Sequence, residues 1–289
     1  MFPKWFWNRI LFFTLLIWSG LCGASDFQSP RTSGLGGAGH AGPFLTETIY
    51  LNPSYLPRVP FYAMGVNYLA HAPDAFVPSS GGSPVGSNYN FSVMASTRDL
   101  PVQIGAGYSR RDDGTLIHFA AAVSLGERVS FGVGSKFSTN SQGIIVGSPD
   151  LSLSATWIAS NMFRFALVVD NLLESLSGSR FYREFVFGSK VQLNSSFSLY
   201  LDPHWSADAT GNQGTFGFEG GAELRVLEYF FLRTGGFSSS TLPFQALRGS
   251  GFSAGLGLSM PKVSMDYSIS QVVQPQLGIL HNVGISLFF

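Results

Sequence analysis

The side chains of this sequence best suited to acid–base chemistry or metal binding are its five histidines: His40, His71, His118, His204 and His281. They are widely scattered, with no His-x-x-x-His or other ligand spacing, so we predict no metal site. His204 is the strongest candidate for a catalytic base, because Asp202 would share its face of a strand. Catalysis would also need a nucleophile and an orienting group within hydrogen-bond reach. We favour the alternative of a hydrogen-bonded structural histidine, and predict no catalytic residue and no enzyme.

A glycine-rich stretch, GLGGAG at Gly34 to Gly39, has the composition of a phosphate-binding loop. Such a loop follows a strand and ends on Lys-Ser or Lys-Thr, and the sequence has neither feature here. We therefore predict no nucleotide and no other cofactor. Glycine also allows a chain to bend sharply and to pass close to packed backbone. Residues 25–60, which lack a two-residue period, are predicted to be an irregular segment of that kind.

The end of the chain indicates which elements position these residues. Residues 278–289 read GILHNVGISLFF, and their apolar side chains recur with the two-residue period of a strand that has one apolar face. A membrane barrel uses such a last strand to close its sheet against the first, whereas a soluble sheet could also end this way. The pattern resembles the C-terminal signal of bacterial outer-membrane proteins at Asn282, Gly284, Leu287 and Phe289.

Composition narrows the protein class further. The 289 residues carry no formal net charge, 12% charged side chains, 34 glycines and 27 phenylalanines. A soluble domain has roughly 25% charged residues, so most of this surface is predicted to face something other than water. After position 25 no window has the roughly 18 apolar residues of a spanning helix. Balanced charge also argues against a nucleic-acid partner.

The first 24 residues have the features of a cleaved signal peptide. Lys4 and Arg9 precede an apolar run over residues 10–21, and we expect cleavage after Ala24. The lone cysteine, Cys22, is either discarded with this peptide or is a lipid-attachment site, although a large Leu21 precedes it.

After residue 60 the two-residue period recurs almost without a break, which predicts an all-β fold, an antiparallel transmembrane barrel of about fourteen strands. Short connections, predicted at 98–100, 126–128, 160–161, 194–195, 227 and 261, alternate with mostly longer ones at 72–87, 139–149, 171–180, 238–249 and 272–277. Such alternation is typical of a barrel with both termini on one side. The strands are predicted at 61–71, 88–97, 101–110, 114–125, 129–138, 150–159, 162–170, 181–193, 196–208, 213–226, 228–237, 250–259, 262–271 and 279–289.

The same period assigns the two faces, with apolar residues toward lipid and polar residues toward the lumen. Inward charges either fill the interior as pairs or line a substrate path. Inward glycines would make room for a plug or a bent wall; they include Gly105, Gly107, Gly132, Gly134, Gly255 and Gly257. The predicted lumen charges are Lys136, Arg164, Asp170, Lys190, Glu219 and Asp266, with Glu184 and Asp202.

Several short motifs resemble the long-chain fatty acid transporter (FadL-type) superfamily of outer-membrane barrels, including its smaller PorV/PorQ-type branch. They are GLGGAGHA at 34–41 with Asn52-Pro53-Ser54, an Asp170-Asn171-Leu172 strand end, and GGAEL at 220–224 followed by FLRTGGF at 231–237. Thr46-Glu47-Thr48 stands where the superfamily usually has an acidic pair. The resemblance implies that residues 25–60 form a plug in a barrel of residues 61–289, with Gly36, Gly37, Gly39, Asn52 and Pro53 as gating candidates.

The resemblance leaves two functions open. The fatty-acid branch implies passage of fatty-acid-like or hydrocarbon-like molecules, with lateral release through a gap in the wall. The PorV-type branch implies a non-transporting platform that holds secreted or surface proteins, and a general diffusion pore is a third alternative. An apolar pocket beside Phe44, Leu45 and 49–51 would favour transport. In each case we expect a bacterial outer-membrane protein whose partners are outer-membrane lipid and the barrel-insertion machinery.

Overall fold

The computed structural model describes residues 27–59, 61–72, 86–96, 101–111, 114–139, 144–174, 183–206, 214–242, 248–275 and 277–289. The predicted signal peptide 1–24, Cys22 included, and most of the first predicted long loop lie outside the described residues.

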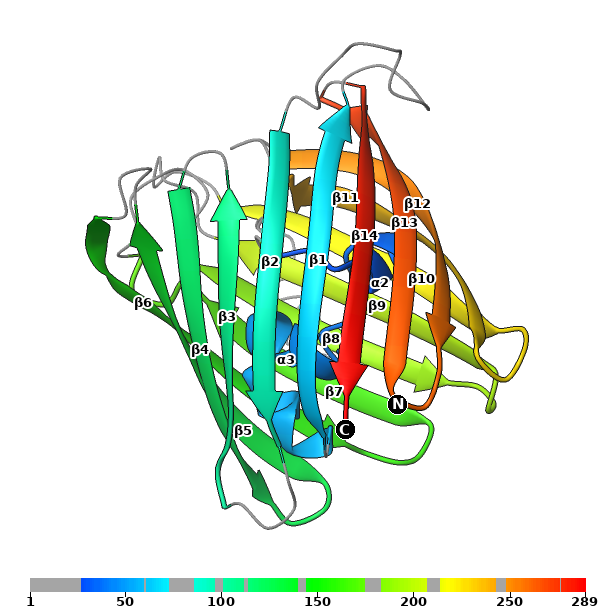
Figure 1. The fold of residues 1–289 in the computed structure, drawn as a ribbon, viewed down its shortest axis with the longest axis horizontal. Helices are drawn as coiled ribbons and strands as arrows, with labels where there is room; N and C mark the ends of the chain where they lie inside the picture. The colour runs from blue at the N-terminus through cyan, green and yellow to red at the C-terminus, as the bar shows by residue number, and fades with distance from the viewer. Residues whose placement is uncertain are drawn as a thin grey trace, which may run out of the picture.

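The described residues form a closed barrel of fourteen antiparallel strands (Figure 1). Each strand pairs with its neighbours in sequence, and the last strand returns to the first with Ala63 opposite Phe288. The predicted strand number and the predicted closure are therefore confirmed. The strands are β1 Tyr62–Ala72, β2 Gly86–Ala95, β3 Gln103–Arg111, β4 Gly114–Leu125, β5 Val129–Thr139, β6 Ile145–Ile158, β7 Phe163–Asp170, β8 Glu184–Gln192, β9 Phe197–Ser206, β10 Thr215–Arg225, β11 Phe230–Thr241, β12 Arg248–Ser259, β13 Val263–Gln274 and β14 Gly278–Phe288.

Several predicted connections were wrong. Strand β6 begins at Ile145 rather than at 150, since the register shift between Lys136 and Ser138 lets pairing with β5 continue past the predicted break. Strand β13 runs to Gln274, so the connection to β14 covers only residues 275–277. The connection between β2 and β3 covers residues 96–102, and is longer than the predicted 98–100. The alternation of short and long connections along the chain is therefore less regular than expected.

The two ends of the barrel are distinguished by their connections. The turn end carries Tyr62, the C-terminal Phe289 and the connections that follow the even-numbered strands, such as 126–128 and 260–262. The loop end carries the connections that follow the odd-numbered strands, including 171–183 between β7 and β8. Both marked chain ends lie at the turn end in Figure 1.

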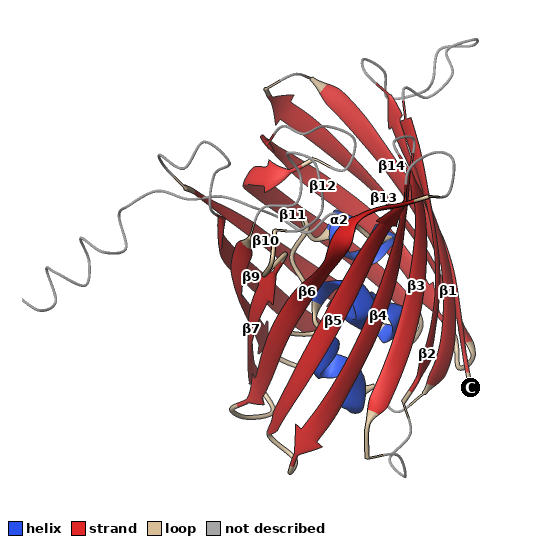
Figure 2. Cartoon of the chain, turned by 90° about the vertical axis from the view of Figure 1, so that its left-hand side faces the viewer, coloured by secondary structure: helices blue, strands red, loops and turns tan. Residues whose placement is uncertain are grey.

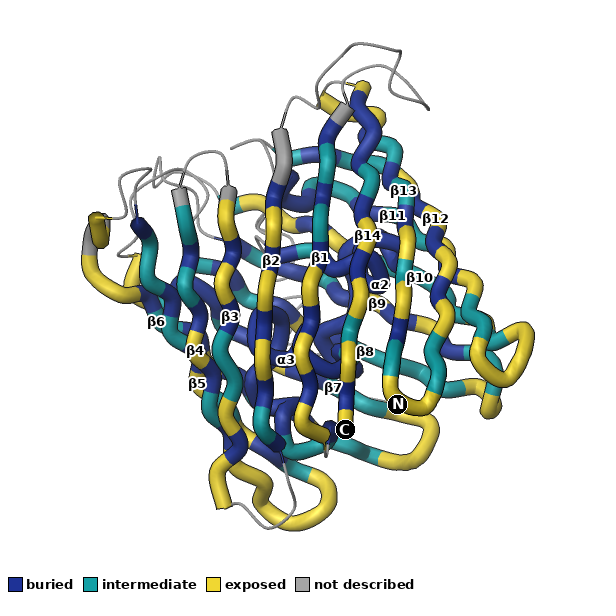
Figure 3. The backbone as a smooth tube through the Cα atoms, in the orientation of Figure 1, coloured by how far each residue is buried: buried dark blue, intermediate teal, exposed yellow. Residues whose placement is uncertain are grey.

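The wall alternates between two environments along each strand (Figure 3). On β14, Val283, Ile285 and Leu287 are each more than two-fifths exposed, whereas the side chain of Asn282 between β13 and β1 is fully buried. On β13, Ser268 and Ser270 are buried in the same way. An outer face made of apolar side chains is suited to hydrocarbon, and the polar residues fill the interior, as predicted from the two-residue period.

Residues 27–59 lie inside this barrel as short helical pieces (Figure 2). Pro30 begins α2, and Ser29 caps it by accepting a hydrogen bond from the backbone of Thr32. The pieces are α2 Pro30–Gly34, η1 Leu45–Glu47, α3 Thr48–Leu51 and η2 Pro53–Arg58. None of the helices in the described part of the chain is long and apolar enough to cross a membrane.

Candidate functional site in the barrel interior

The glycine-rich loop of the N-terminal segment lies directly on a glycine patch of the wall. Leu35 and Gly36 pass over Gly221 of β10 and Gly235 of β11, where a Cβ atom would collide with the loop backbone. A Cβ atom on Gly36 would in turn collide with the backbone of Gly236. Gly36 has φ of 71°, a left-handed conformation that glycine adopts without strain. The two motifs GGAEL and FLRTGGF therefore form the seat of the loop.

Wall glycines also face the rest of the segment. Three wall glycines each leave a space that the segment occupies. Ile49 fills the space at Gly105, Tyr50 the space at Gly107, and the Pro53–Ser54 backbone the space at Gly132. Gly255 lies against Gly34. The predicted inward glycines thus mark the path of the N-terminal segment, with the exception of Gly257, which makes room for the side chains of Arg233 and Asp266.

A chain of buried ion pairs ties α2 to the strands beneath it. Arg31 Nη1 contacts Glu47 Oε2 at 3.1 Å, and Arg31 Nε contacts Glu223 Oε2 at 3.0 Å. Glu223 also accepts from Arg233 Nε at 2.7 Å, and Arg233 pairs with Asp266 of β13. Buried charges of this kind are stable only when paired and hydrogen-bonded. Glu47, in place of the family's acidic pair, supplies the carboxylate within the segment.

A second polar cluster holds the middle of the segment. Asp202 Oδ2 accepts hydrogen bonds from the backbone N–H groups of Gly39 and His40 at 2.7 and 2.8 Å, and lies 2.8 Å from His40 Nδ1. Burial alone would lower the pKa of His40, but the hydrogen bond and charge of Asp202, with the charge of Glu219, raise it above its ordinary value. The pairing with Asp202 therefore favours the protonated form of His40.

The same cluster decides the part played by His204. Its side chain is buried on the inner face with Asp202, as predicted, but the carboxylate of Asp202 is bonded to the segment instead. His204 Nε2 is buried without a hydrogen-bond partner, close to Gly217. His204 is therefore a packed side chain of the wall. The histidine that contacts Asp202 is His40, which sequence reasoning missed.

Asn52 and Ser54 of the predicted Asn-Pro-Ser motif are fully buried and fasten the segment to β6. Asn52 Nδ2 donates to the carbonyl oxygen of His40 at 2.7 Å and to Thr156 Oγ1 at 2.9 Å. Ser54 N donates to Ser154 Oγ at 2.9 Å. Pro53 begins η2 between them, where a missing N–H leaves no hydrogen bond unmade.

The six predicted lumen charges all lie on the inner side of the wall, in different settings. Lys136 pairs with Asp170, and its Nζ also donates a hydrogen bond to Asn171 Oδ1 at 3.0 Å. Glu219 lies against Gly37, whose φ of 97° lets the loop pass beside the carboxylate. Asp266 belongs to the Arg31 chain. The remaining two, Arg164 and Lys190, face each other across β7 and β8.

The opposite side of the interior is apolar. Leu45, Ile49 and Tyr50 of the segment pack with Met94 and Ala120 of the wall, in one cluster that also includes Phe288 of the last strand. Phe27 stacks on Tyr50 with ring centroids 3.9 Å apart. The segment therefore turns a charged side to β9–β13 and an apolar side to β1–β4.

Outside this apolar side, the wall carries a hollow of about 560 Å³ over β2–β5. Small outward residues, Ala106 and Ala121, form its floor between the larger Ile104, Phe119 and Val133. Gly105 in the same floor has Ile49 on its inner side. The hollow and the apolar cluster therefore lie on opposite sides of strands β2–β4.

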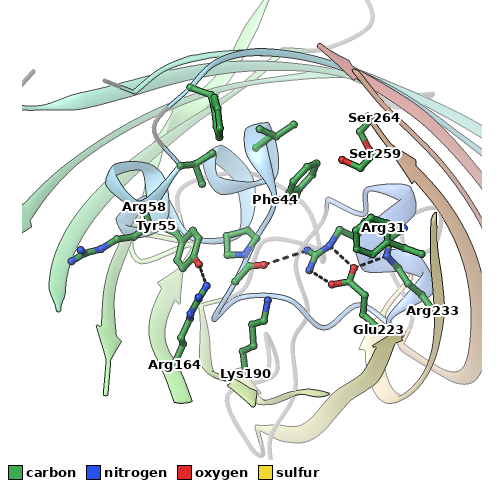
Figure 4. A pocket seen from close by; sticks show the side chains of 16 residues that line it. Arg31, Phe44, Tyr55, Arg58, Arg164, Lys190, Glu223, Arg233, Ser259 and Ser264 are labelled. Atoms are coloured by element: carbon green, nitrogen blue, oxygen red, sulfur yellow. Dashed lines mark hydrogen bonds and ion pairs between the residues drawn. The ribbon is translucent and has the colours of Figure 1, made fainter. Parts of the chain in front are cut away.

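A second cavity, of about 280 Å³, lies inside the barrel at the turn end (Figure 4). Its walls combine aromatic rings from the segment and strands with basic side chains. Figure 4 shows Lys190 and Arg164 pointing into it from below Phe44, with Glu223 held between Arg31 and Arg233 at one side. The basic residues on its wall are Arg31, Arg58, Arg164, Lys190 and Arg233.

No protein-family model and no curated protein sequence matches the chain. Solved structures do. The CymD monoaromatic hydrocarbon channel superposes with a TM-score of 0.62 and 14% identity, covering 93% of this chain and 98% of that one. The Ralstonia pickettii toluene transporter TbuX gives 0.62 and 12%, covering 91% and 98%. A Pseudomonas aeruginosa FadL homologue gives 0.58 and 12%, covering 93% and 99%. The chain has the FadL-type barrel fold.

One expectation drawn from the FadL-type resemblance, a lateral gap in the wall, is not met between the strands that carry the hollow. Pairing between β2 and β3 runs without a break from Tyr89 to Ala95, and pairing of β3 with β4 covers the whole of β3. This part of the wall carries a hollow with small side chains instead of a gap.

Arg31, His40, Glu223 and Arg233 are the functional candidates that sequence reasoning did not single out. Glu223 and Arg233 lie inside the quoted FadL-type motifs, where Glu223 follows a glycine pair and Arg233 precedes one, and this spacing was a usable signal. Nothing local indicated the partners of Arg31 and His40 on the wall, because Glu223 and Asp202 are more than 150 residues away in the sequence. Within the described ranges, no group of three or more His, Cys, Asp or Glu side chains is placed to hold a metal ion.

Proposed function

We propose that this protein is an outer-membrane channel for hydrophobic small molecules, with residues 27–59 as the plug that controls passage. The observation that carries the proposal is the apolar side of the interior, where Leu45, Ile49 and Tyr50 lie behind the part of the wall that carries the hollow. An apolar molecule that displaces these side chains exchanges one apolar surface for another, so its passage requires no burial of a charge.

The charged side of the interior supports a plug that moves in part. Ion pairs and hydrogen bonds from Arg31 and His40 anchor the segment to β9–β13, whereas the side facing β1–β4 is held by apolar packing. Apolar contacts are non-directional, and a ligand can replace them one by one. We infer that the segment stays anchored on one side while Ile49 and its neighbours shift.

The names of the structural neighbours agree with this proposal. CymD is described as a monoaromatic hydrocarbon channel and TbuX as a toluene transporter. The outer hollow gives the proposed exit, since it places a molecule that has crossed the wall in contact with lipid. The outer-membrane location is part of the proposal, and rests on the apolar outer face and on the C-terminal pattern.

A substitution in the hollow tests the proposal. Ala121→Trp fills the hollow from the lipid side, and we expect it to lower uptake of labelled toluene by cells carrying the protein several-fold. Ala155→Trp is the matched control, because Ala155 is also a half-buried outward residue, but on β6. Equal uptake by cells with and without the wild-type protein would contradict the proposal. A purified barrel free of ligand that retains one secreted protein in stoichiometric amount would favour a platform instead.

A further inference from the structure

The cavity at the turn end contains an arrangement of charges that the proposed passage of neutral molecules does not use. Arg164 of β7 and Lys190 of β8 are directly opposite each other in the antiparallel pair, and both point into the barrel. Directly opposite residues have Cβ atoms about 5 Å apart, and like charges at such positions are destabilising. The register of β7 with β8 therefore keeps two cations side by side inside the barrel.

Nearby carboxylates do not neutralise the two cations. Glu223 Oε2 accepts from Arg31 Nε and Arg233 Nε, and its Oε1 accepts from Tyr200 Oη at 3.1 Å, so its oxygens are occupied. Among the described residues, Arg164 donates to one partner, the neutral hydroxyl of Tyr55 at 2.6 Å, and its Nε is buried without a partner.

Lys190, like Arg164, has no carboxylate partner among the described residues. Its ammonium lies 5.0 Å from the centroid of the Tyr200 ring, a cation–π contact, and no hydrogen bond or ion pair joins it to another described residue. Tyr200 is its neighbour on β9, and the hydroxyl of Tyr200 donates to Glu223. Two basic groups with unused donors therefore face one space.

The lining of this space also includes apolar and aromatic side chains. Phe44, Phe61 and Phe231 line it together with Leu45 and Val59. A volume of about 280 Å³ accommodates a compact molecule and excludes a long acyl chain in extended form. The site thus offers two cations at one side and aromatic rings at the other.

We propose that this cavity binds a small aromatic carboxylic acid, with its carboxylate between Arg164 and Lys190 and its ring among the phenylalanines. A carboxylate accepts several charge-assisted hydrogen bonds, which matches the unused donors of both side chains. The inference rests on the proposed function for its supply of ligand, and extends that function from neutral hydrocarbons to aromatic acids.

Calorimetric titration of the full barrel in dodecyl maltoside tests the inference with 4-ethylbenzoate and its neutral counterpart 4-ethylbenzyl alcohol. We expect the acid to bind at least tenfold more tightly than the alcohol. Lys190→Met, which keeps the length of the side chain and removes its charge, should lower the affinity for the acid at least tenfold, and Lys190→Arg should restore most of it. Lys262→Met, at an exposed residue of a turn at the same end, should leave it unchanged.

Folding of each variant is checked by heat-dependent migration on gels, and Arg164→Gln provides a second variant should Lys190→Met fail that check. Equal affinity for acid and alcohol, no binding of the acid, or full affinity in the folded charge-removing variants overturns the inference. If toluene uptake persists in that case, the proposed channel function stands alone. If toluene uptake is also absent, both fail.

Discussion

Asp202 shows how single residues hold the segment inside the barrel. Its two oxygens accept from the backbone of Gly39, His40 and Ser189, and from the ring of His40. A carboxylate that is fully buried and accepts this many donors fixes the loop in one position, because a buried group that loses a hydrogen bond is left unsatisfied. The glycine-rich loop is therefore held by its own backbone N–H groups as well as by packing.

The charge on His40 makes this attachment dependent on pH. The folded protein raises the pKa of His40 above the ordinary value of 6.5, so the imidazolium–Asp202 pair contributes fully below about pH 6.5 and is lost as the pH rises through the raised value. We expect hydrogen–deuterium exchange of residues 34–56, corrected for intrinsic rates, to increase over that rise.

His40→Gln should remove this increase, whereas His281→Gln, at a residue on the outer face that bonds Tyr267, should retain it. An unchanged pH profile in His40→Gln would show that the attachment depends on other groups.

At the scale of elements, the paired strands β10 and β11 form the surface on which the glycine-rich loop packs. Glu223 and Arg233 are opposite each other, and two pairs further along Gly221 lies opposite Gly235. The glycines admit the loop backbone and the charged pair receives Arg31. Side chains at the positions of Gly221 and Gly235 would collide with the loop backbone and exclude it from this place.

Neighbouring glycines on β10 allow a controlled test of this role. A Cβ atom at Gly221 would lie 2.6 Å from the carbonyl oxygen of Leu35, whereas at Gly220, on the outer face, the nearest atom would be 3.5 Å away. We expect Gly221→Ala to expose residues 34–56 to limited proteolysis while the barrel keeps its heat-dependent migration, and Gly220→Ala to behave as wild type. Equal protection of the segment in both variants would contradict the proposed seat.

At the scale of the whole molecule, closure by β14 joins the wall, the segment and the chain end. The backbone N–H of Phe289 donates to the carbonyl oxygen of Tyr62 at 2.9 Å, and the neighbouring Phe288 turns inward against Phe44 and Phe61. The two last residues thus face opposite environments: Phe288 is 9% exposed and Phe289 is 66% exposed.

This difference predicts two separate phenotypes. Deletion of Phe289 should lower the amount of folded protein in the outer membrane several-fold and leave the unfolding midpoint of purified barrel in urea nearly unchanged, because its ring packs on little else. Phe288→Ala should lower the free energy of unfolding by about 3 kcal/mol, as expected for loss of a buried ring. The reverse pattern would contradict the assignment of Phe289 to the insertion signal.

The sequence by itself determined the strands, their number, their two faces and the closure at β14, because the two-residue period is a local property that each strand shows independently. It also marked the wall glycines and the six inward charges. Boundaries were less accurate where a register shift extended a strand, as at Lys136 in β5.

The tertiary structure alone decided which inward residues meet. Arg31 contacts Glu223 and His40 contacts Asp202 across more than 150 positions, and the side of the interior that each strand occupies depends on how the closed barrel surrounds the segment. The opposed cations Arg164 and Lys190 follow from the register of β7 with β8, which no single strand encodes. Periodicity predicts which residues face inward, whereas the closed barrel determines which of these residues contact each other.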